Sequence, residues 1–600
     1  MPSPGVGHVV QRESRSLLRL KDGSRIGVIG GGPAGSFFAY FVLLTARRVG
    51  LSLEVDIFEP MDFSKPGPAG CNMCGGVISE SLVQNLAGEG ICLPADVIQR
   101  RIDSYVLHMD VGSVLIETPL EEKRIAAVHR GAGPRTFRPE NARSFDAYLL
   151  GLARGLGARI VPERVTGVEW SDGRPSLQTQ GQRRETYDLV AAAVGVNAAA
   201  LERESERGEA SYEPPRTTRA YISEFFLGRS ILKRYIGGSM HVFLVDVPRL
   251  EFAAIIPKSD YVTACLLGEE VDRALTESFL NSAEVKSCMP PLWRPPKDRC
   301  HCSPRINIGA APRPFVDRMV YIGDCATTRL YKDGIGAAYR TAKAAAAAAV
   351  LRGVSAESFR RYYAPACRSI EADNRIGKII FALARRARKS QQLGRAVLRM
   401  VSREQRLAGV RRRMSLVLWD LFTGSASYRS ILRRMFHPAF LASFVVNLVA
   451  ANRHSSHIRS QKRIPMSLEG TGVLGNRFQD GEIIVRQGEL GDCMYLVEKG
   501  TVEVLQREGD KEFCLTELGP GDFFGETAIF EGETRPATVR AVGEAWVYSL
   551  QRDSLLRRIH EDPSLAFGLI QQMSYRIREL ERALLARVSS ASWPTAAATR

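Results

Sequence analysis

Apolar and polar positions form recognisable blocks near the start of the chain. Residues 25–29 are an apolar run typical of a buried strand, and a glycine-rich turn at 30–35 leads into an apolar helical pattern at 37–48. A second strand pattern at 53–58 ends in Glu59. Strand, helix and strand in this order predict a parallel α/β sheet with the turn at one edge.

The glycine turn has the spacing of a Rossmann-type dinucleotide fingerprint. Gly30 permits a tight turn, Gly32 and Ala34 open a helix whose N-terminus a pyrophosphate can approach, and Gly35 lets that helix pack on the strand. Glu59, at the end of the second strand, can hold ribose hydroxyls. The fingerprint predicts a bound dinucleotide but does not separate NAD from FAD.

A second glycine motif lies almost 300 residues further along the chain. Gly323 and Asp324 follow another short apolar strand, and Gly334, Ile335 and Gly336 then open an alanine-rich helix. This motif resembles the second flavin motif of the para-hydroxybenzoate hydroxylase superfamily, which implies FAD. The resemblance places Asp324 at the ribityl hydroxyls and the amides after Gly334 at the flavin pyrimidine edge, where a helix N-terminus stabilises negative charge.

A cysteine- and glycine-rich turn at residues 66–79 resembles the Cys-Gly-Gly turn of the geranylgeranyl reductase family. The resemblance covers roughly residues 22–350. It places Cys74, Gly75 and Gly76 beside the flavin ring as catalytic positions, with Cys74 a candidate proton donor by position alone. It also implies reduction of a carbon-carbon double bond in an isoprenoid or another lipid-like substrate.

The substrate side departs from that family. Its members carry an aromatic-rich Tyr-x-Trp-x-Phe-Pro motif, whereas residues 252–258 here read Phe-Ala-Ala-Ile-Ile-Pro-Lys. A wider, aliphatic pocket is therefore expected, and the substrate stays open. The electron donor also stays open between NAD(P)H and a small electron carrier, because no second dinucleotide fingerprint is present.

The eleven cysteines are scattered through apolar runs, as reduced thiols are. Cys71 and Cys74 could form a redox pair, or could bind metal together with Cys300 and Cys302. Neither pair has the usual surroundings of a metal knuckle, so no metal site is predicted.

Glycine turns and alternating apolar positions return near the C-terminus and predict a small β-barrel of the jelly-roll type. The segment 524–538 resembles the phosphate-binding cassette of a cyclic nucleotide-binding domain. The resemblance implies a site made by Phe524, Gly525, Glu526, Thr527, Ala528, Arg535, Ala537 and Thr538. Pro536 stands where a hydroxyl residue would favour the guanine nucleotide, so cyclic AMP is expected rather than cyclic GMP.

The formal net charge of +17 has one source. Between residues 375 and 463 there are 20 lysines and arginines against two acids, Glu404 and Asp420, which gives a local balance of +18. Basic residues that border short apolar helices suit an anionic membrane surface. The alternatives are solvated helix faces, a cover over the flavin pocket, or docking of the acidic C-terminal domain. Nucleic acid is not expected, because no reading motif accompanies the charge.

Five segments follow from these patterns: an N-terminal tail (1–21), FAD-binding and inserted β-rich substrate domains (22–350), a basic helical region (351–466), the cyclic nucleotide-binding domain (467–585) and a C-terminal tail (586–600). No signal peptide or membrane span is evident, which favours a cytoplasmic protein, peripheral on the inner face of the membrane if the basic helices bind lipid. The predicted function is a cyclic nucleotide-regulated FAD oxidoreductase. A flavin-dependent NAD(P)H monooxygenase and a non-catalytic redox sensor remain alternatives.

Overall fold

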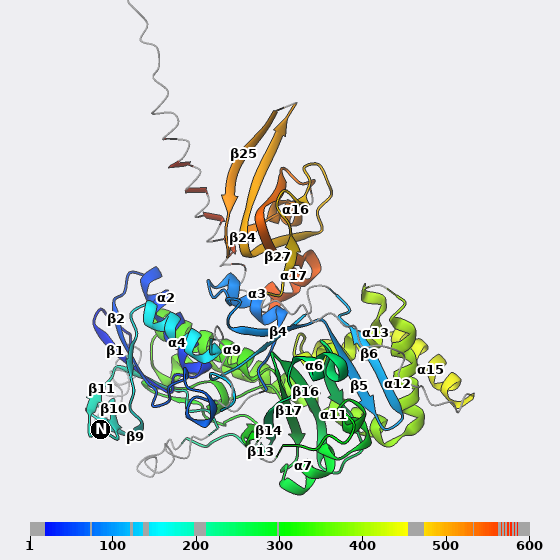
Figure 1. Ribbon diagram of the computed structural model, residues 1–600. Coiled ribbons are helices and arrows are strands. Elements are labelled where there is room, and N and C mark those ends of the chain that lie inside the picture. Colours follow the sequence, from blue (N-terminus) through cyan, green and yellow to red (C-terminus); the bar gives the residue numbers. More distant parts are fainter. Residues whose placement is uncertain are drawn as a thin grey trace, which may run out of the picture. The chain divides into compact units, whose positions relative to one another are not determined.

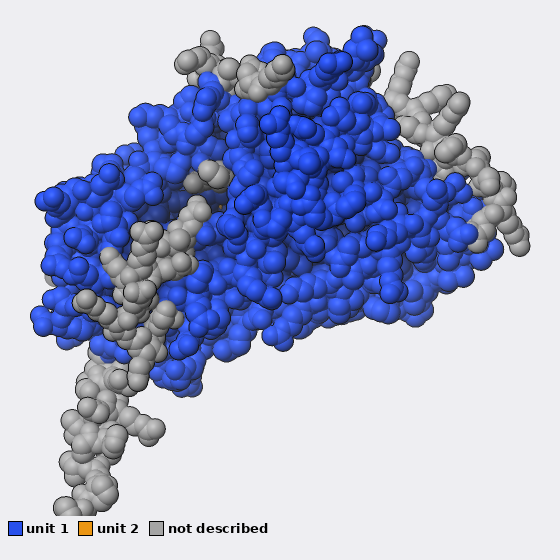
Figure 2. Space-filling model, turned by 90° about the horizontal axis from the view of Figure 1, so that it is seen from below, with its two compact units in different colours: residues 1–79, 95–472 blue, residues 80–94, 473–600 orange. Residues whose placement is uncertain are grey.

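The computed structural model describes residues 18–585, with gaps at 72–74, 121–123, 136–142, 197–211, 297–298, 408, 454–472, 510, 532, 562–565 and several short stretches between 567 and 584. The contacts divide the chain into two compact units. Unit 1 comprises residues 1–79 and 95–472, and unit 2 comprises residues 80–94 and 473–600. The described residues of unit 1 form one continuous body in Figure 2.

A mostly parallel sheet organises the first part of unit 1 (Figure 1). Helix α2 (Pro33–Arg48) connects its strands β1 and β2, which run parallel, as the sequence predicts. Among the described residues its strand order is β20 (Phe315–Val316), β21 (Met319–Tyr321), β12 (Leu189–Ala192), β1 (Ser24–Ile29), β2 (Leu53–Phe58) and β8 (Arg159–Val161). Strands β12 and β21 come from distant parts of the sequence, but both run parallel to β1 in this sheet. The glycine motifs that follow β1 and β21 therefore lie at the same edge of the sheet.

A second, mixed sheet is inserted between β2 and β21. In the described chain its order is β18 (Cys300–Cys302), β14 (Tyr221–Phe226), β17 (Tyr261–Gly268), β16 (Leu250–Lys258), β15 (Met240–Phe243), β5 (Ser104–Met109) and β6 (Gly112–Glu117). One face packs against α7 (Arg273–Leu280) and α8 (Ala283–Ser287) around Phe243 and Phe279. This is the predicted β-rich insertion.

The basic region is helical and covers the other face of this sheet. Its helices are α10 (Ala356–Tyr362), α11 (Ala364–Lys389), α12 (Gln391–Glu404), α13 (Arg413–Thr423), α14 (Tyr428–Met435) and α15 (Pro438–Arg453). Trp419 packs on Tyr105 of β5, and Phe381 stacks on Phe252 of β16. These helices therefore complete the core of unit 1.

No single described helix is long and apolar enough to cross a membrane. The pair α14 and α15, bent by 63° at the break between them, meets the same criterion of length and composition when taken together.

Smaller elements complete unit 1. They are the sheet β3 (Val77–Ser79), β7 (Ile125–Val128) and β4 (Ile98–Ile102); the sheet β9 (Val165–Ser171), β10 (Arg174–Thr179) and β11 (Arg184–Thr186); the pair β13 (Thr217–Arg219) and β19 (Arg305–Asn307); and the helices α4 (Phe145–Gly155), α6 (Arg229–Ile231) and α9 (Gly334–Leu351). Helices α2 and α9 pack against each other, with Phe37 against Tyr339.

Unit 2 is built on an antiparallel sheet. Its strands are β22 (Asn476–Phe478), β23 (Ile483–Val485), β24 (Cys493–Glu508), β25 (Lys511–Leu518), β26 (Phe523–Phe524) and β27 (Thr538–Gln551). Two short helices, α16 (Glu526–Glu531) and α17 (Arg552–Glu561), follow β26 and β27. Helix α3 (Glu80–Gly88), which follows β3 in the sequence, also belongs to this unit. The predicted jelly-roll closure stays a prediction.

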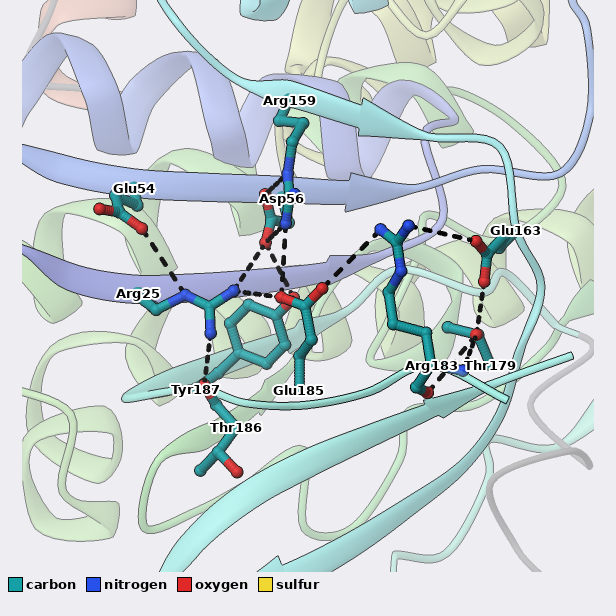
Figure 3. A network of polar contacts seen from close by, with 10 residues as sticks. All are labelled: Arg25, Glu54, Asp56, Arg159, Glu163, Thr179, Arg183, Glu185, Thr186 and Tyr187. Atoms are coloured by element: carbon teal, nitrogen blue, oxygen red, sulfur yellow. Dashed lines mark hydrogen bonds and ion pairs between the residues drawn. The ribbon is translucent and has the colours of Figure 1, made fainter. Parts of the chain in front are cut away.

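A buried carboxylate joins the strands of the parallel sheet near its edge (Figure 3). Asp56 on β2 accepts two hydrogen bonds of 2.7 Å from Arg159 and one of 2.9 Å from the hydroxyl of Tyr187, and Arg25 lies 3.4 Å away. Burial opposes ionisation of Asp56, but the hydrogen bonds from Arg159 and Tyr187 outweigh it and hold the pKa of the carboxyl below its ordinary value.

We expect Asp56→Asn to destabilise unit 1 by about 2 kcal/mol at neutral pH. This is less than the roughly 3–5 kcal/mol for a fully buried ion pair, because the Arg159 side chain is 54% exposed. Since folding lowers the pKa of Asp56, its stabilisation is present above about pH 4 and is lost as the pH falls through the folded-state pKa.

Thermal unfolding between pH 7 and pH 3 measures this effect. The difference between wild type and Asp56→Asn should shrink towards the acid end. Glu54→Gln, on the same strand but with a side chain 69% exposed, is the matched control and should change the melting temperature little. Equal losses in both variants would contradict the assignment.

Candidate functional site

One large cavity in unit 1 collects both glycine motifs. Its volume is about 1110 Å3, somewhat above the roughly 300–1,000 Å3 of pockets for drug-sized ligands. The sequence-predicted residues that line it are Gly30, Gly32, Ala34, Glu59, Gly75, Gly76, Asp324, Gly334 and Ile335. Gly35, Gly323 and Gly336 stand behind this wall, where their lack of a side chain permits close packing against the backbone of Gly30 and the side chains of Ala34 and Asp333, respectively.

The first motif forms a tight turn that ends in the open N-terminus of α2. Gly30 has a φ of +99°, and a Cβ added at Gly35 would lie 1.9 Å from the carbonyl oxygen of Gly30. No side chain caps α2 at Gly32. The free backbone N–H groups of a 16-residue helix therefore face the cavity, as a pyrophosphate requires.

The second motif supplies a similar helix start. Asp333, at the N-cap of α9, has a left-handed backbone, and no side chain caps the helix, so Gly334 and Ile335 present its first turn to the cavity. A Cβ on Gly336 would lie 2.1 Å from Oδ1 of Asp333, which explains the third glycine of this motif. Two positive helix ends thus open into one cavity.

The two motifs also touch each other. A Cβ added at Gly323 would lie 2.6 Å from the Cβ of Ala34. Next to this contact, the carboxyl of Asp324 lines the cavity, and burial raises its pKa. A cavity-facing carboxyl suits the recognition of hydroxyl groups on a ligand.

Glu59 lines the cavity where the sequence predicts a ribose ligand. Its Oε2 accepts a hydrogen bond of 2.8 Å from the N–H of Gly31, and its Oε1 accepts one of 2.8 Å from Met61. Burial raises the pKa of this carboxyl, although both N–H groups favour its ionised form. The carboxylate thus holds the glycine turn in place, and its remaining lone pairs can accept from a ligand hydroxyl.

Part of the cavity wall is apolar. Phe252, Ala254 and Ile256 alternate along β16 with their side chains on the cavity wall, and Cys265 of β17 and Phe422 of α13 add to it. The segment 252–258, in which the family's aromatic motif is replaced, therefore lines the pocket. Because Phe422 and Thr423 belong to α13, the basic helical region also contributes to the cover of the cavity.

The turn next to this apolar wall is closely packed. A Cβ on Gly75 would lie 2.8 Å from Sγ of Cys265, and one on Gly76 would lie 2.0 Å from the carbonyl oxygen of Val128. Both glycines are therefore required by packing, in addition to any role at a ligand. Cys74, the candidate proton donor, lies outside the described residues.

Sequence analysis missed a buried charge pair behind this turn. Lys258 donates a hydrogen bond of 3.1 Å to Glu224, and His129 Nδ1 lies 3.5 Å from the same carboxylate oxygen. Burial opposes ionisation of Glu224, but Lys258 and His129 hold its pKa well below the usual range. A Cβ on Gly76 would lie only 3.0 Å from Nζ of Lys258, which places this cation beside the cavity wall. In the sequence, the one indication of this pair was Lys258, a charged residue at the end of the apolar run 252–258.

The sequence predicts no metal site, but the structure gathers a group of possible metal ligands. In the part of the chain that the structure describes, ring nitrogens of His108 and His241 and Sγ of Cys288 lie within 4.8 Å of one another, all buried. His108 Nε2 and His241 Nδ1 are already 2.9 Å apart in a hydrogen bond. Of the four cysteines considered from the sequence, Cys71 lines the cavity, whereas Cys300 and Cys302 lie on β18.

In unit 2 the cassette residues gather around Arg535. The Arg535 side chain is buried, and its two Nη atoms donate hydrogen bonds of 2.9 and 2.5 Å to the carbonyls of Gly525 and Cys493. Its guanidinium lies 5.8 Å from the ring centre of Tyr495, which stacks on Phe524. The cation is thus fixed beside Gly525, whose φ is +78°.

The remaining cassette residues follow from this geometry. Glu526, Thr527 and Ala528 form the first turn of α16 directly after Gly525. Ala537 is buried, and Thr538 begins β27 and accepts a hydrogen bond of 3.0 Å from the N–H of Gln487. A fixed guanidinium beside a helix start is suited to a cyclic phosphate.

Comparison with solved structures finds distant neighbours for the larger part of the chain. The oxygenase of 2-methyl-3-hydroxypyridine-5-carboxylic acid matches 60% of this chain and 90% of its own, with 16% identity and a TM-score of 0.42. At that level no activity carries over. The Thermus thermophilus catabolite activator protein matches 19% of this chain and 55% of its own, with 34% identity and a TM-score of 0.17.

Curated relatives match the C-terminal part. The regulatory subunit of the cAMP-dependent protein kinase of Dictyostelium discoideum is 32% identical over 170 residues, 27% of this chain and 48% of the relative. A CRP-like cAMP-activated global transcriptional regulator of Mycobacterium tuberculosis is 32% identical over 102 residues, 17% of this chain and 46% of the relative. The chain thus spans about half the length of these relatives. Residues 476–562 match the family model "Cyclic nucleotide-binding domain", so the C-terminal unit contains a cyclic nucleotide-binding domain.

Proposed function

We propose that this chain is an FAD-dependent oxidoreductase that acts on a lipid-like substrate and is regulated by cyclic AMP. The observation that carries the proposal is a single cavity that is lined by two uncapped helix N-termini and by the apolar strand β16. Its geometry fits FAD: the α2 end suits the pyrophosphate, Asp324 the ribityl hydroxyls, and the α9 end the pyrimidine edge of the ring. When bound, FAD would supply hydride or electron transfer.

The protein's own residues would bind and orient the reactants. The Gly75–Gly76 turn lets a substrate approach without obstruction, and the wall of Phe252, Ala254 and Ile256 excludes water from it. Lys258, held by Glu224 behind Gly76, places a positive charge near the cavity wall. An aliphatic wall of this kind favours an isoprenoid or acyl chain, with reduction of a double bond as the reaction.

A flavin-dependent NAD(P)H monooxygenase is the second candidate, because the same cavity and the same cofactor end serve both reactions. Oxygen consumption separates them. A reductase should convert its substrate under anaerobic conditions with a chemical electron donor, whereas a monooxygenase should require one oxygen molecule per turnover. Purified protein that carries no flavin would contradict both the reductase and the monooxygenase.

Helix α3 offers the structural basis for regulation. It follows β3 directly, and β3 follows Gly75 and Gly76 at the cavity, yet α3 belongs to the cyclic nucleotide unit. Within that unit, Cys92 lies beside the turn before β26: a Cβ on Gly521 would be 3.5 Å from its Sγ. Strand β26 then leads into the cassette at Gly525. We propose that this run of chain from β3 through α3 to Cys92 carries the effect of cyclic AMP to the cavity.

We expect cyclic AMP to change the rate of flavin reduction in the full chain by about 5- to 150-fold, the range that a coupling of roughly 1–3 kcal/mol allows. Stopped-flow absorbance of the flavin, with and without saturating cyclic AMP, measures the ratio. An identical rate in both conditions, with binding verified by calorimetry, would refute regulation and favour an uncoupled enzyme. No turnover, together with a flavin-dependent change in cyclic AMP affinity, would favour the redox sensor.

The role of α3 is tested by Cys92→Ala. This variant should still bind cyclic AMP, but its ratio of rates with and without ligand should move towards one, because it removes the thiol that lies beside the Gly521 turn. Cys514→Ala is the matched control, since Cys514 lies exposed on β25 of the same unit. The same ratio in wild type and in Cys92→Ala would exclude this contact as the link.

A further inference from the structure

Helix α15 is apolar on two opposite faces. Its inner face, which includes Phe440 and Ala451, is buried, and the helix packs against α12. Its outer face carries Leu441, Val445 and Val449 at intervals of four residues, which places them in one row. Figure 1 shows α15 at the outer edge of the helical layer of unit 1, beyond α12.

The outer row is exposed to an unusual degree. Leu441, Val445, Val446 and Val449 are 44% to 58% exposed, and Phe436, in the turn before α15, is 65% exposed. We call these five residues the α15 face. A helix that is apolar all round is normally covered on all sides, and contiguous exposed apolar groups mark an interaction site. The exposure of the α15 face therefore indicates that it binds another molecule or surface.

Most charges on the helices around this face are basic, and the partly exposed acid Glu371 of α11 is paired with Arg375. Between residues 375 and 453 the only acids in the sequence are Glu404 and Asp420, and they are 4% and 0% exposed. Glu404 accepts hydrogen bonds from the N–H groups of Met414 and Ser415, and Asp420 pairs with Arg434. Both acids are thus buried and bonded within the fold, and they do not offset the basic charge at the surface.

Among the described residues between 375 and 453, seven basic side chains of these helices are exposed. Arg433 of α14 is exposed and lies one helical turn before Phe436 in the sequence. Arg403 of α12 reaches α15 by a hydrogen bond of 3.2 Å to Asn447. Helix α11, which contacts α14, adds the exposed Ile379 and Leu383. The exposed lysines and arginines of these helices are Arg375, Lys378, Arg386, Lys389, Arg403, Arg429 and Arg433.

We propose that the α15 face docks unit 1 on an anionic lipid surface. Small aliphatic side chains and one aromatic ring would enter the region between headgroups and acyl chains, while the arginine rim would pair with anionic headgroups. A protein partner would need an acidic rim around a matching apolar groove, whereas a bilayer offers both chemistries without shape complementarity. The proposal is independent of the flavin chemistry and of cyclic AMP.

Co-sedimentation of the full chain with vesicles tests it. Binding is expected to vesicles of phosphatidylcholine mixed with phosphatidylglycerol, and it should weaken as salt is raised, because the charges are exposed. The double variant Val445→Ser/Val449→Ser should reduce the partition coefficient by about tenfold or more, since it removes methyl groups that would be buried in the lipid. Arg433→Gln should weaken binding mainly at low salt.

The controls separate lipid binding from misfolding and from self-association. Leu292→Ser changes an apolar residue that is 99% exposed elsewhere in unit 1 and should bind vesicles like wild type. Melting temperatures identify any variant that fails to fold, and in that case Val449→Ser alone replaces the double variant. Undiminished vesicle binding by the folded double variant, or no binding by wild type, overturns the proposal. A dimer that dissociates in the double variant, with no vesicle binding, would show that the face joins two copies instead.

Discussion

Arg535→Ala should reduce cyclic AMP affinity by about 30-fold or more, because truncating one partner of a buried, hydrogen-bonded charge pair costs roughly 2–5 kcal/mol. Arg535 is the cation that the cassette holds beside Gly525, through its hydrogen bonds to the carbonyls of Gly525 and Cys493. Its guanidinium is already ordered before a ligand arrives, so little conformational entropy is lost on binding. Calorimetric titration of the full chain measures the change.

The same titration has an internal control. Arg540→Ala removes an arginine from β27 of the same unit, but this residue pairs with Glu503 on β24, so its loss should leave affinity within about twofold, the range of an exposed ion pair. Arg535→Lys should bind more weakly than wild type, since an ammonium group cannot span two carbonyls and a phosphate as a guanidinium does. Equal affinity in wild type and in Arg535→Ala would show that the cyclic phosphate binds elsewhere.

Gly35→Ala should yield protein with roughly tenfold less bound flavin, or none. The added methyl group would lie 1.9 Å from the carbonyl oxygen of Gly30, and overpacking of this kind costs about 1–3 kcal/mol. The glycine turn would have to move, and with it the N–H groups of α2 that face the cavity. The flavin absorbance per chain of purified protein measures the effect.

Gly151→Ala is the matched control for that variant. Gly151 lies in α4, where nothing stands within 4 Å of an added Cβ, so the flavin content should not change and the helix should be slightly stabilised. Thermal unfolding of both variants distinguishes loss of cofactor from loss of fold. A folded Gly35→Ala protein with full flavin content would mean that the turn does not hold the cofactor.

The sequence predicted the local parts of these sites. The fingerprint at Gly30 to Gly35 and the cassette around Gly525 are short motifs whose residues adopt their geometry through neighbours in the chain, so spacing alone identifies them. The structure adds that Gly323 rests on Ala34, so two motifs that the sequence assigns to one cofactor also pack directly against each other. Adjacency of this kind depends on the order of strands in a sheet.

Charged pairs between residues that are distant in the chain could not be predicted from the sequence. Glu224 and Lys258 are 34 residues apart in the chain and meet because β14 and β16 both flank β17. In the helical region, the excess of basic residues was evident, but the burial of Glu404 and Asp420 was not. The sequence alone therefore did not show whether these two acids lie on the surface, where they would offset part of the basic charge.

The membership of α3 in the second unit has a consequence for synthesis of the chain. Residues 80–94 leave the ribosome early, whereas the rest of their unit begins at residue 473, a wait of 473 − 94 = 379 residues, or about 20–80 s at roughly 5–20 residues per second. During that time Leu86 and Ile91, fully buried in the folded protein, lack their partners. Apolar surface that stays exposed during synthesis is prone to aggregate, and in a chain cut before residue 473 this segment would lack the rest of its unit permanently.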